Sequence, residues 1–430
     1  MEELVNICFV TNRPTWPLYP GFKRRAGMVL LALEAIGDVD LVMALPDEYS
    51  SVPSPPTLDA QRVTLTQVIR PRKAKAVGQW LRGPLPMSMN SVTWSSGSSV
   101  VQQRLSAKPY DIVWVLAGTA WPLVRGIIDQ FPSTNFVIDL DDLEDEKIRH
   151  RQATTSINFR SPSSVAHRLV DTVDVRRWER LHQEIAARSS AITVCSATDV
   201  AKLQSRFPSA NVHAVPNGYN DPGRVQTDDD VDHAAPTILF VGDLKYRPNE
   251  EAARFLCCDV LPIIQRTCPE ALVRLVGGAG DAHDLARTPG VQVAGVVESI
   301  EHELLRSTIS AAPLLSGGGT RIKIIEAFAH GVPVVSTTIG AEGLDVQQGN
   351  HLLMGDSPED FARSCCSIIE SESLRSRLRS GGRERFVESF TSSTVDEAVR
   401  SVVAGVVATR RYPTTDTIVR LRRSPIKTRS

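Results

Sequence analysis

Short runs of apolar residues alternate along the chain with longer stretches in which apolar residues recur at helical spacing. This alternation is typical of parallel β-sheets whose strands are joined by covering helices. In the first half we expect strands at Leu4–Thr11, Val39–Ala44, Asp111–Leu116, Asn135–Leu140, Ala191–Val194 and His213–Pro216. Helices are expected at Gly27–Ile36 and Asp171–Arg188, and residues 46–56 are expected to form a loop.

A break in composition follows at residues 219–235, which contain Pro, Gly and an acidic cluster but few residues that could pack. Beyond it we expect strands at Thr237–Val241, Leu272–Val276, Val291–Val297, Ala311–Leu315 and Val332–Ser336. Helices are expected at Asn249–Ile264, Glu301–Leu305, Arg321–His330, 358–370 and 373–388. The pattern predicts an α/β protein of two Rossmann-like halves, 1–216 and 217–390. A helix at 391–409 would pack back on the first half.

Composition narrows the class of protein. The 430 residues are 42% hydrophobic and 23% charged with a net charge of −1, which excludes a disordered chain and a general polyanion binder, so no nucleic-acid partner is expected. The seven cysteines never form a CxxC motif, and neither a signal peptide nor a membrane-spanning run is evident. We therefore expect a cytoplasmic protein with reduced thiols.

Two segments carry local positive charge. Residues 410–430 hold seven basic residues and one acidic residue, a local charge of +6, and lack an apolar face, so we expect a disordered tail. Lys73–Arg82 holds basic residues around Trp80 and Leu81. A solvated helix face is the favoured interpretation there, and peripheral contact with a membrane is the alternative.

The most informative segment is Ser316–Leu344, SGGGTRIKIIEAFAHGVPVVSTTIGAEGL. Its three glycines follow a strand and let the backbone turn tightly into a helix whose first amides can bind an anion. Arg321 and Lys323 put positive charge in the first helical turn, where it opposes the helix dipole unless an anion is bound. Glu326 lies among apolar residues and can accept hydrogen bonds from ribose hydroxyls. A solvated helix face carrying ion pairs of Arg321 and Glu326 is the less favoured alternative.

Together with FVGDLKYRPNEEA at 240–252 and VPNGYN at 215–220, this segment resembles the retaining GT-B glycosyltransferases of family 4. The likeness covers residues 215–390 well and the first half more weakly. It implies a GT-B fold in which the second half binds a nucleotide-diphosphate sugar and the first half binds the acceptor across a cleft.

The resemblance also assigns residues. The family carries two glutamates eight positions apart, and the second matches Glu326, which becomes a ribose ligand. Gly318 stands where the first is expected, so that sugar contact is either missing or made by backbone amides of the segment Gly317, Gly318, Gly319 and Thr320. Arg321 and Lys323 are expected to hold the diphosphate and stabilise it as it leaves.

Further donor contacts are expected from two loops of the second half. Lys245 and Arg247 follow its first strand and are weaker candidates for the diphosphate, because the Gly-Arg-…-Lys arrangement of the family is matched imperfectly. Val296, in Gly295-Val296-Val297, resembles the segment whose backbone holds the base. An ordinary strand end is an equally favoured interpretation of Val296.

In the first half, Gly21 is expected in a loop that faces the diphosphate, with a plain turn as the alternative. Asp141 and Asp142 end a strand at the edge where α/β proteins bind ligands, and such carboxylates can bind acceptor hydroxyls or a divalent cation. Capping of a helix is the alternative role. The retaining chemistry of the family needs no metal, so neither a metal nor a cofactor is expected. Three histidines are expected on solvated helices: His150, His167 and His182.

The resulting prediction is transfer of a sugar, with retention of configuration, from a nucleotide-diphosphate sugar to a hydroxyl of a glycan, lipid-linked or natural-product acceptor. A sugar-nucleotide epimerase of the same fold is one alternative. A degenerate glycosyltransferase that only binds nucleotide is another, and Gly318 supports it. A NAD dehydrogenase is disfavoured because no GxGxxG motif follows the first strand.

Overall fold

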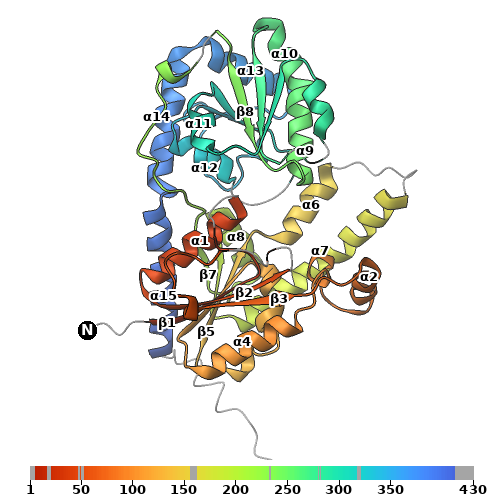
Figure 1. Cartoon of the computed structure of the whole chain (residues 1–430), viewed down its shortest axis with the longest axis vertical. Coiled ribbons are helices and arrows are strands. Elements are labelled where there is room, and N and C mark those ends of the chain that lie inside the picture. The colour runs from red at the N-terminus through yellow and green to blue at the C-terminus, as the bar shows by residue number, and fades with distance from the viewer. Residues whose placement is uncertain are drawn as a thin grey trace, which may run out of the picture.

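The protein consists of two α/β halves stacked along its long axis, as the computed structural model shows (Figure 1). Each half has one parallel sheet with helices on both faces. Among the described residues, none of the helices combines the length and the apolarity needed to cross a membrane. The described residues are 5–16, 21–46, 49, 53–154, 162–231, 234–278, 280, 282–316 and 321–411.

The first half is built on a seven-stranded parallel sheet with the strand order β3-β2-β1-β4-β5-β6-β7. Its strands are β1 (Val5–Thr11), β2 (Gly37–Pro46), β3 (Val63–Val68), β4 (Ile112–Leu116), β5 (Asn135–Asp141), β6 (Ala191–Val194) and β7 (Val212–Ala214). Its helices are α1 (Gly21–Glu34), α2 (Lys73–Arg82), α3 (Met87–Asn90), α4 (Ser95–Ala107), α5 (Pro122–Arg125), α6 (Glu144–Thr154), α7 (Pro162–Arg188) and α8 (Ala197–Arg206). The central strand β4 is buried at all five residues, as expected for a strand covered on both faces.

The second half is built on a six-stranded parallel sheet with the strand order β10-β9-β8-β11-β12-β13. Its strands are β8 (Thr237–Val241), β9 (Leu272–Val276), β10 (Val291–Gly295), β11 (Ile309–Ala312), β12 (Val334–Ser336) and β13 (Leu353–Met354). Its helices are α9 (Arg247–Arg254), α10 (Leu261–Thr267), α11 (Ile300–Leu305), α12 (Ile322–Ala329), α13 (Pro358–Glu370) and α14 (Glu372–Ser389). Both sheets are wholly parallel, which confirms the predicted α/β class.

The chain passes between the halves twice, and the two passes lie side by side. The backbone N–H of Tyr219 donates to the carbonyl of Phe390 at 2.8 Å. Gly218 is packed so closely that a β-carbon there would lie 2.6 Å from Val395. Helix α15 (Ser392–Arg411) then returns to the first half and packs its valines against α1. The last helix therefore belongs to the core of the first half.

The structure corrects two predictions from the sequence. The helix expected at Asn249–Ile264 consists of α9, a π-helical segment at Phe255–Val260, and α10. Pro262 lacks an N–H group for the regular helical ladder, which accounts for a break close to it. His182 is only 1% exposed and not on a solvated face, because α6 covers it and places Asp145 3.3 Å away.

Candidate functional site

Helix α12 carries a buried carboxylate that faces the first half. Glu326 is 4% exposed, and its Oε1 lies 2.9 Å from Nη2 of Arg24 on α1. Burial raises the pKa of Glu326, while Arg24 and Lys323 oppose this shift. The guanidinium of Arg24 also stacks over the ring of Tyr219 at 4.1 Å. Glu326 is therefore neither on a solvated face nor paired with Arg321, and its partner comes from the other half of the chain.

Lys323 lies one turn before Glu326 on the same helix and is poorly solvated. Its Nζ is 3.2 Å from Oδ1 of Asn249 and 4.2 Å from the centre of the Phe240 ring. Burial, helped by the charge of Arg321, lowers the pKa of Lys323 to about 7, although Glu326 opposes the shift. A buried ammonium beside another cation is unfavourable unless an anion joins them, so this position is suited to a phosphate.

Arg321 is the N-cap residue, directly before the first residue of α12. Burial lowers its pKa, and the charges of Asp142, Tyr246 and Glu342 act in the opposite direction. Asp142 belongs to the first half and Tyr246 to the loop between β8 and α9. Arg321 thus lies where the two halves and this loop come together, at the carboxyl edge of the second sheet.

The first half presents a set of paired charges at the carboxyl end of β5. Asp139 is fully buried and accepts two hydrogen bonds from Arg25, at 3.2 Å from Nε and 2.9 Å from Nη2. The same guanidinium donates to the carbonyl of Val215 and the side chain of Asn217, at 2.9 and 3.0 Å. Arg25 therefore ties the end of β5 to the point where the chain leaves the first half.

Asp141 has a left-handed backbone, with φ of 63°, which turns its side chain toward the edge of the sheet. Its carboxylate lies 2.8 Å from Nη1 of Arg13, and despite its burial Arg13 and Arg25 hold the pKa of Asp141 below its usual value. Asp142 is paired with Lys147. Burial raises the pKa of Asp142, and Lys147 opposes the shift.

A metal could in principle use Asp141, Asp142 and Cys195, whose ligand atoms lie within 4.8 Å of one another. The donor set does not fit a cation well. Burial, together with Asp142, raises the pKa of the Cys195 thiol to about 12, so the thiol is protonated. Both carboxylates already have cationic partners within the described part of the chain. These three residues are therefore poorly suited to bind a metal ion.

A second bridge joins the halves at Glu342, in the loop after β12. Its carboxylate lies 2.9 Å from Nζ of Lys202 on α8 and 3.8 Å from Nδ1 of His150 on α6. Glu342 also belongs to the charges that act on Arg321. Carboxylates of the second half thus meet cations of the first half on two sides of the α12 terminus.

The structure brings some of the predicted site residues together at the start of α12. Arg321, Lys323 and Glu326 lie together on α12, with Asp142 facing Arg321 from the other half. The four predicted loop residues, Gly317 to Thr320, lie outside the described residues.

The remaining predicted residues lie around this core. Gly21 begins α1, the helix that carries Arg24. Lys245 is exposed in the loop next to Arg321. Arg247 is 61% exposed in its side chain and bonded to Glu251 at 2.7 Å, so the structure does not bring it into the buried cluster. Val296 is 77% exposed just beyond the end of β10.

Four residues of the site were not singled out from the sequence. Arg24 follows Gly21 in the segment already marked for the cleft, and Tyr219 lies within the VPNGYN motif. Asn249 lies in the first turn of α9 and Glu342 in the loop after β12, both beside the α12 terminus. A search for charged or aromatic residues within the quoted motifs would have found Tyr219 and Glu342, and a search of the residues just after Gly21 would have found Arg24.

Solved structures with the same arrangement of halves define the class of fold. Sucrose-phosphate synthase from Thermosynechococcus elongatus matches with a TM-score of 0.70 and 14% identity, over 94% of this chain and 99% of that one. Anabaena Alr3699/HepE in complex with UDP and glucose matches with a TM-score of 0.63 and 14% identity, over 93% and 99%. The predicted GT-B fold is confirmed.

The sequence comparisons identify the second half more closely. Residues 235–371 match the family Glycosyl transferases group 1, so this half carries a domain of that type. A lipopolysaccharide core biosynthesis glycosyltransferase, LpsE of Rhizobium meliloti (strain 1021), is 35% identical over 83 residues, 19% of this chain and 24% of LpsE. An uncharacterized 44.6 kDa protein of the cps region of Klebsiella pneumoniae is 26% identical over 172 residues, 38% of this chain. The chain spans 44% of that relative, less than half the length of either curated protein.

Proposed function

We propose that the protein is a retaining glycosyltransferase that moves a sugar from a nucleotide-diphosphate donor to a hydroxyl group of an acceptor. The observation that carries this proposal is the buried cluster of Arg321, Lys323 and Glu326 at the start of α12. Two poorly solvated cations at a helix N-terminus suit a diphosphate, and a buried carboxylate one turn further suits the ribose hydroxyls. HepE, which shares the fold, is solved in complex with UDP and glucose, and this supports a nucleotide-sugar donor.

In the proposed complex, Arg321 and Lys323 stabilise the negative charge that gathers on the diphosphate as the bond to the sugar breaks. The ribose hydroxyls share Glu326 with Arg24, which brings α1 against the nucleotide. The exposed segment at Val296 lies at the end of β10 and would face the base. Retention of configuration follows from the resemblance to family 4, in which the departing phosphate helps to deprotonate the incoming hydroxyl on the same face of the sugar.

The acceptor is proposed to bind in the first half. A cavity of about 270 Å³ lies at the carboxyl ends of β1 to β4, lined by residues that include Asn12, Arg13, Tyr49 and Trp94. Arg13 also holds Asp141, so the cavity adjoins the paired carboxylates. Aromatic and hydrogen-bonding side chains of this kind suit a hydroxyl-rich molecule. All seven cysteines are free thiols, and we place the reaction in the cytoplasm, where they stay reduced.

The test is a time course by proton NMR with a panel of UDP- and GDP-sugars, alone and with glycan and glycolipid acceptors. We expect release of the nucleoside diphosphate together with a new glycoside whose anomeric configuration matches that of the donor. We expect turnover to be abolished by Glu326→Gln and by Lys323→Met. The matched controls are Glu370→Gln and Arg377→Met, at exposed positions of α13 and α14, which should retain turnover. An epimer of the donor formed without acceptor, or nucleotide binding without turnover across the panel, contradicts the proposal.

A further inference from the structure

Helix α2 carries basic and apolar side chains on its exposed surface. Lys73, Val77 and Leu81 follow one another at a spacing of four residues and form a stripe along the helix. The side chains of Val77 and Leu81 are 43% and 67% exposed. The adjacent stripe, Ala76 and Trp80, is buried against the protein. The helix is therefore anchored on one side and presents apolar residues to the outside on another.

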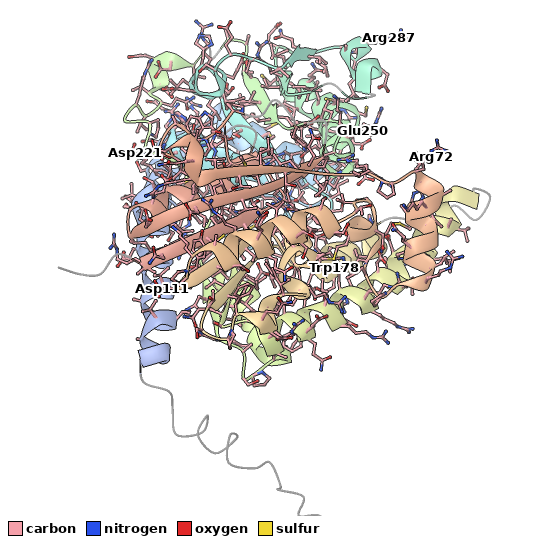
Figure 2. All side chains as sticks on the ribbon, turned by 60° about the horizontal axis from the view of Figure 1, so that its bottom comes forward. Arg72, Asp111, Trp178, Asp221, Glu250 and Arg287 are labelled. Atoms are coloured by element: carbon pink, nitrogen blue, oxygen red, sulfur yellow. The ribbon has the colours of Figure 1, made fainter. Side chains whose placement is uncertain are left out.

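The partner of α2 is the first part of α7, which adds two more exposed apolar residues. The indole N–H of Trp80 donates to Asp174 at 2.7 Å, and the guanidinium of Arg177 stacks on the same ring at 4.8 Å. Leu169 and Val173, which lie just before Asp174, are 63% and 38% exposed. Figures 1 and 2 show α2 and the start of α7 side by side at one flank of the first half.

Exposed apolar side chains are concentrated at this flank. Among the described residues, nine large hydrophobic side chains are exposed, and six of them belong to β3, the segment after it, α2 and α7. These six are Leu65, Ile69, Val77, Leu81, Leu169 and Val173. Single exposed apolar residues need no explanation, but a group of them on neighbouring elements indicates a surface that binds something.

The charged residues of α2 and of the segments before and after it are all basic. Residues 60–110 contain eight basic residues and not one Asp or Glu. Arg72, Lys73, Lys75 and Arg82 are exposed, and within the described part of the chain no carboxylate pairs with them. Arg72 lies directly before the first residue of α2, at the flank of the first half (Figure 2). Two acids lie on this part of α7: Asp171 is paired with Arg151, and Asp174 is buried and accepts hydrogen bonds from Trp80 and the backbone N–H of Met87.

We propose that this surface, defined by Lys73, Lys75, Val77, Leu81 and Leu169 and called here the α2–α7 face, docks on an anionic lipid bilayer. Anionic headgroups neutralise the basic residues, and the apolar stripe between them enters the boundary between headgroups and acyl chains. A nucleic acid or an acidic polymer would match the charge but would leave the apolar stripe in water. The sequence of α2 alone favoured a solvated face, and the apolar residues that α7 adds change that interpretation.

The α2–α7 face lies next to the cavity of the first half. Arg70 and Ser88, which line that cavity, lie in the segments just before and after α2. An acceptor anchored in the same bilayer would therefore meet the cavity beside the docked helix. Only this last step rests on the function proposed above, because docking itself can be measured without substrate.

The experiment is co-sedimentation of the full-length protein with vesicles of phosphatidylcholine, with and without phosphatidylglycerol. We expect binding only to the anionic vesicles, weakened by salt. Each basic residue near an anionic surface contributes about fivefold in partitioning, so Lys73→Glu combined with Lys75→Glu should weaken binding by at least about 25-fold. The matched control reverses two exposed arginines of the second half, Arg266→Glu and Arg377→Glu, and should retain binding.

The apolar contribution is tested separately. Leu81→Ser should weaken binding by about tenfold because it removes one inserted side chain. Val387→Ser, which changes a 52% exposed residue on α14, is its control and should have no effect. Melting temperatures of all variants establish that each is folded.

Three outcomes overturn the proposal. If the Lys73/Lys75 reversal leaves vesicle binding unchanged, the binding belongs to another basic region, such as residues 410–430. Equal loss in the Arg266/Arg377 control would indicate a general charge effect. If Leu81→Ser binds the vesicles fully while the Lys73/Lys75 reversal loses binding, the face recognises anionic groups without inserting apolar side chains into the bilayer.

Discussion

The buried ammonium of Lys323 should make nucleotide binding depend on pH. In the free protein, burial and Arg321 lower the pKa of Lys323 to about 7. A bound diphosphate is an anion beside this group and raises its pKa again. Above pH 7 the nucleotide therefore binds together with a proton, so affinity falls as pH rises. The limit for one linked proton is about tenfold per pH unit, or about 1.4 kcal/mol.

The perturbation is Lys323→Met, which keeps the length of the side chain and removes both the charge and the proton. At pH 7 it should weaken binding by roughly tenfold to a hundredfold, the range for a hydrogen bond to a charged group. The wild-type protein loses affinity toward pH 9 and the variant does not, so the two curves should converge.

The assay is isothermal titration of UDP and GDP between pH 7 and 9, where most of the diphosphate is already ionised. Two buffers of different ionisation enthalpy measure the uptake of the proton directly. Lys245→Met, at an exposed position in the neighbouring loop, is the control and should keep the wild-type pH dependence. A wild-type affinity that does not change with pH, or a slope that survives in Lys323→Met, would refute the reasoning.

The remaining predictions concern stability, measured by chemical denaturation unless another assay is named. Lys323→Met should raise the melting temperature of the free protein at pH 7 by about two to four degrees, because a lysine pKa below its unfolded value of 10.5 costs stability as pH falls from there toward 7. Arg24→Ala should destabilise by about 3 kcal/mol, since it leaves the buried carboxylate of α12 unpaired. Val399→Ala on α15 should cost about 2 kcal/mol through the cavity it creates in the core of the first half. A double-mutant cycle on the partly exposed pair of Lys202 and Glu342 should give less than about 1 kcal/mol.

Buried parallel strands were the best predicted elements. Ala191–Val194, Thr237–Val241 and Leu272–Val276 agree with the structure residue for residue. A strand covered on both faces is a nearly continuous apolar run, interrupted here by Thr193 and Arg274, so its ends coincide with the change in polarity. The edge strand β3 was missed because only one of its six residues, VTLTQV, is fully buried and polar residues interrupt the pattern. Helix α4 begins with serines and a glycine and shows no apolar period there.

The site was predictable only where its chemistry is local in the sequence. Arg321, Lys323 and Glu326 lie within one helix, so their proximity follows from helical spacing. The partner of Glu326 is Arg24, near the other end of the chain, and nothing in the sequence around Arg24 distinguishes it from Arg25. Arg25 points the other way and binds Asp139. Contacts between the halves depend on how the two sheets face each other, which no local pattern encodes.

The most direct test of the proposed function is the fate of the sugar on the donor. In the NMR time course, the account predicts that the nucleoside diphosphate appears in step with a glycoside of unchanged anomeric configuration, and that Glu326→Gln abolishes both signals. A glycoside of inverted configuration, or a donor that is only isomerised, would contradict it.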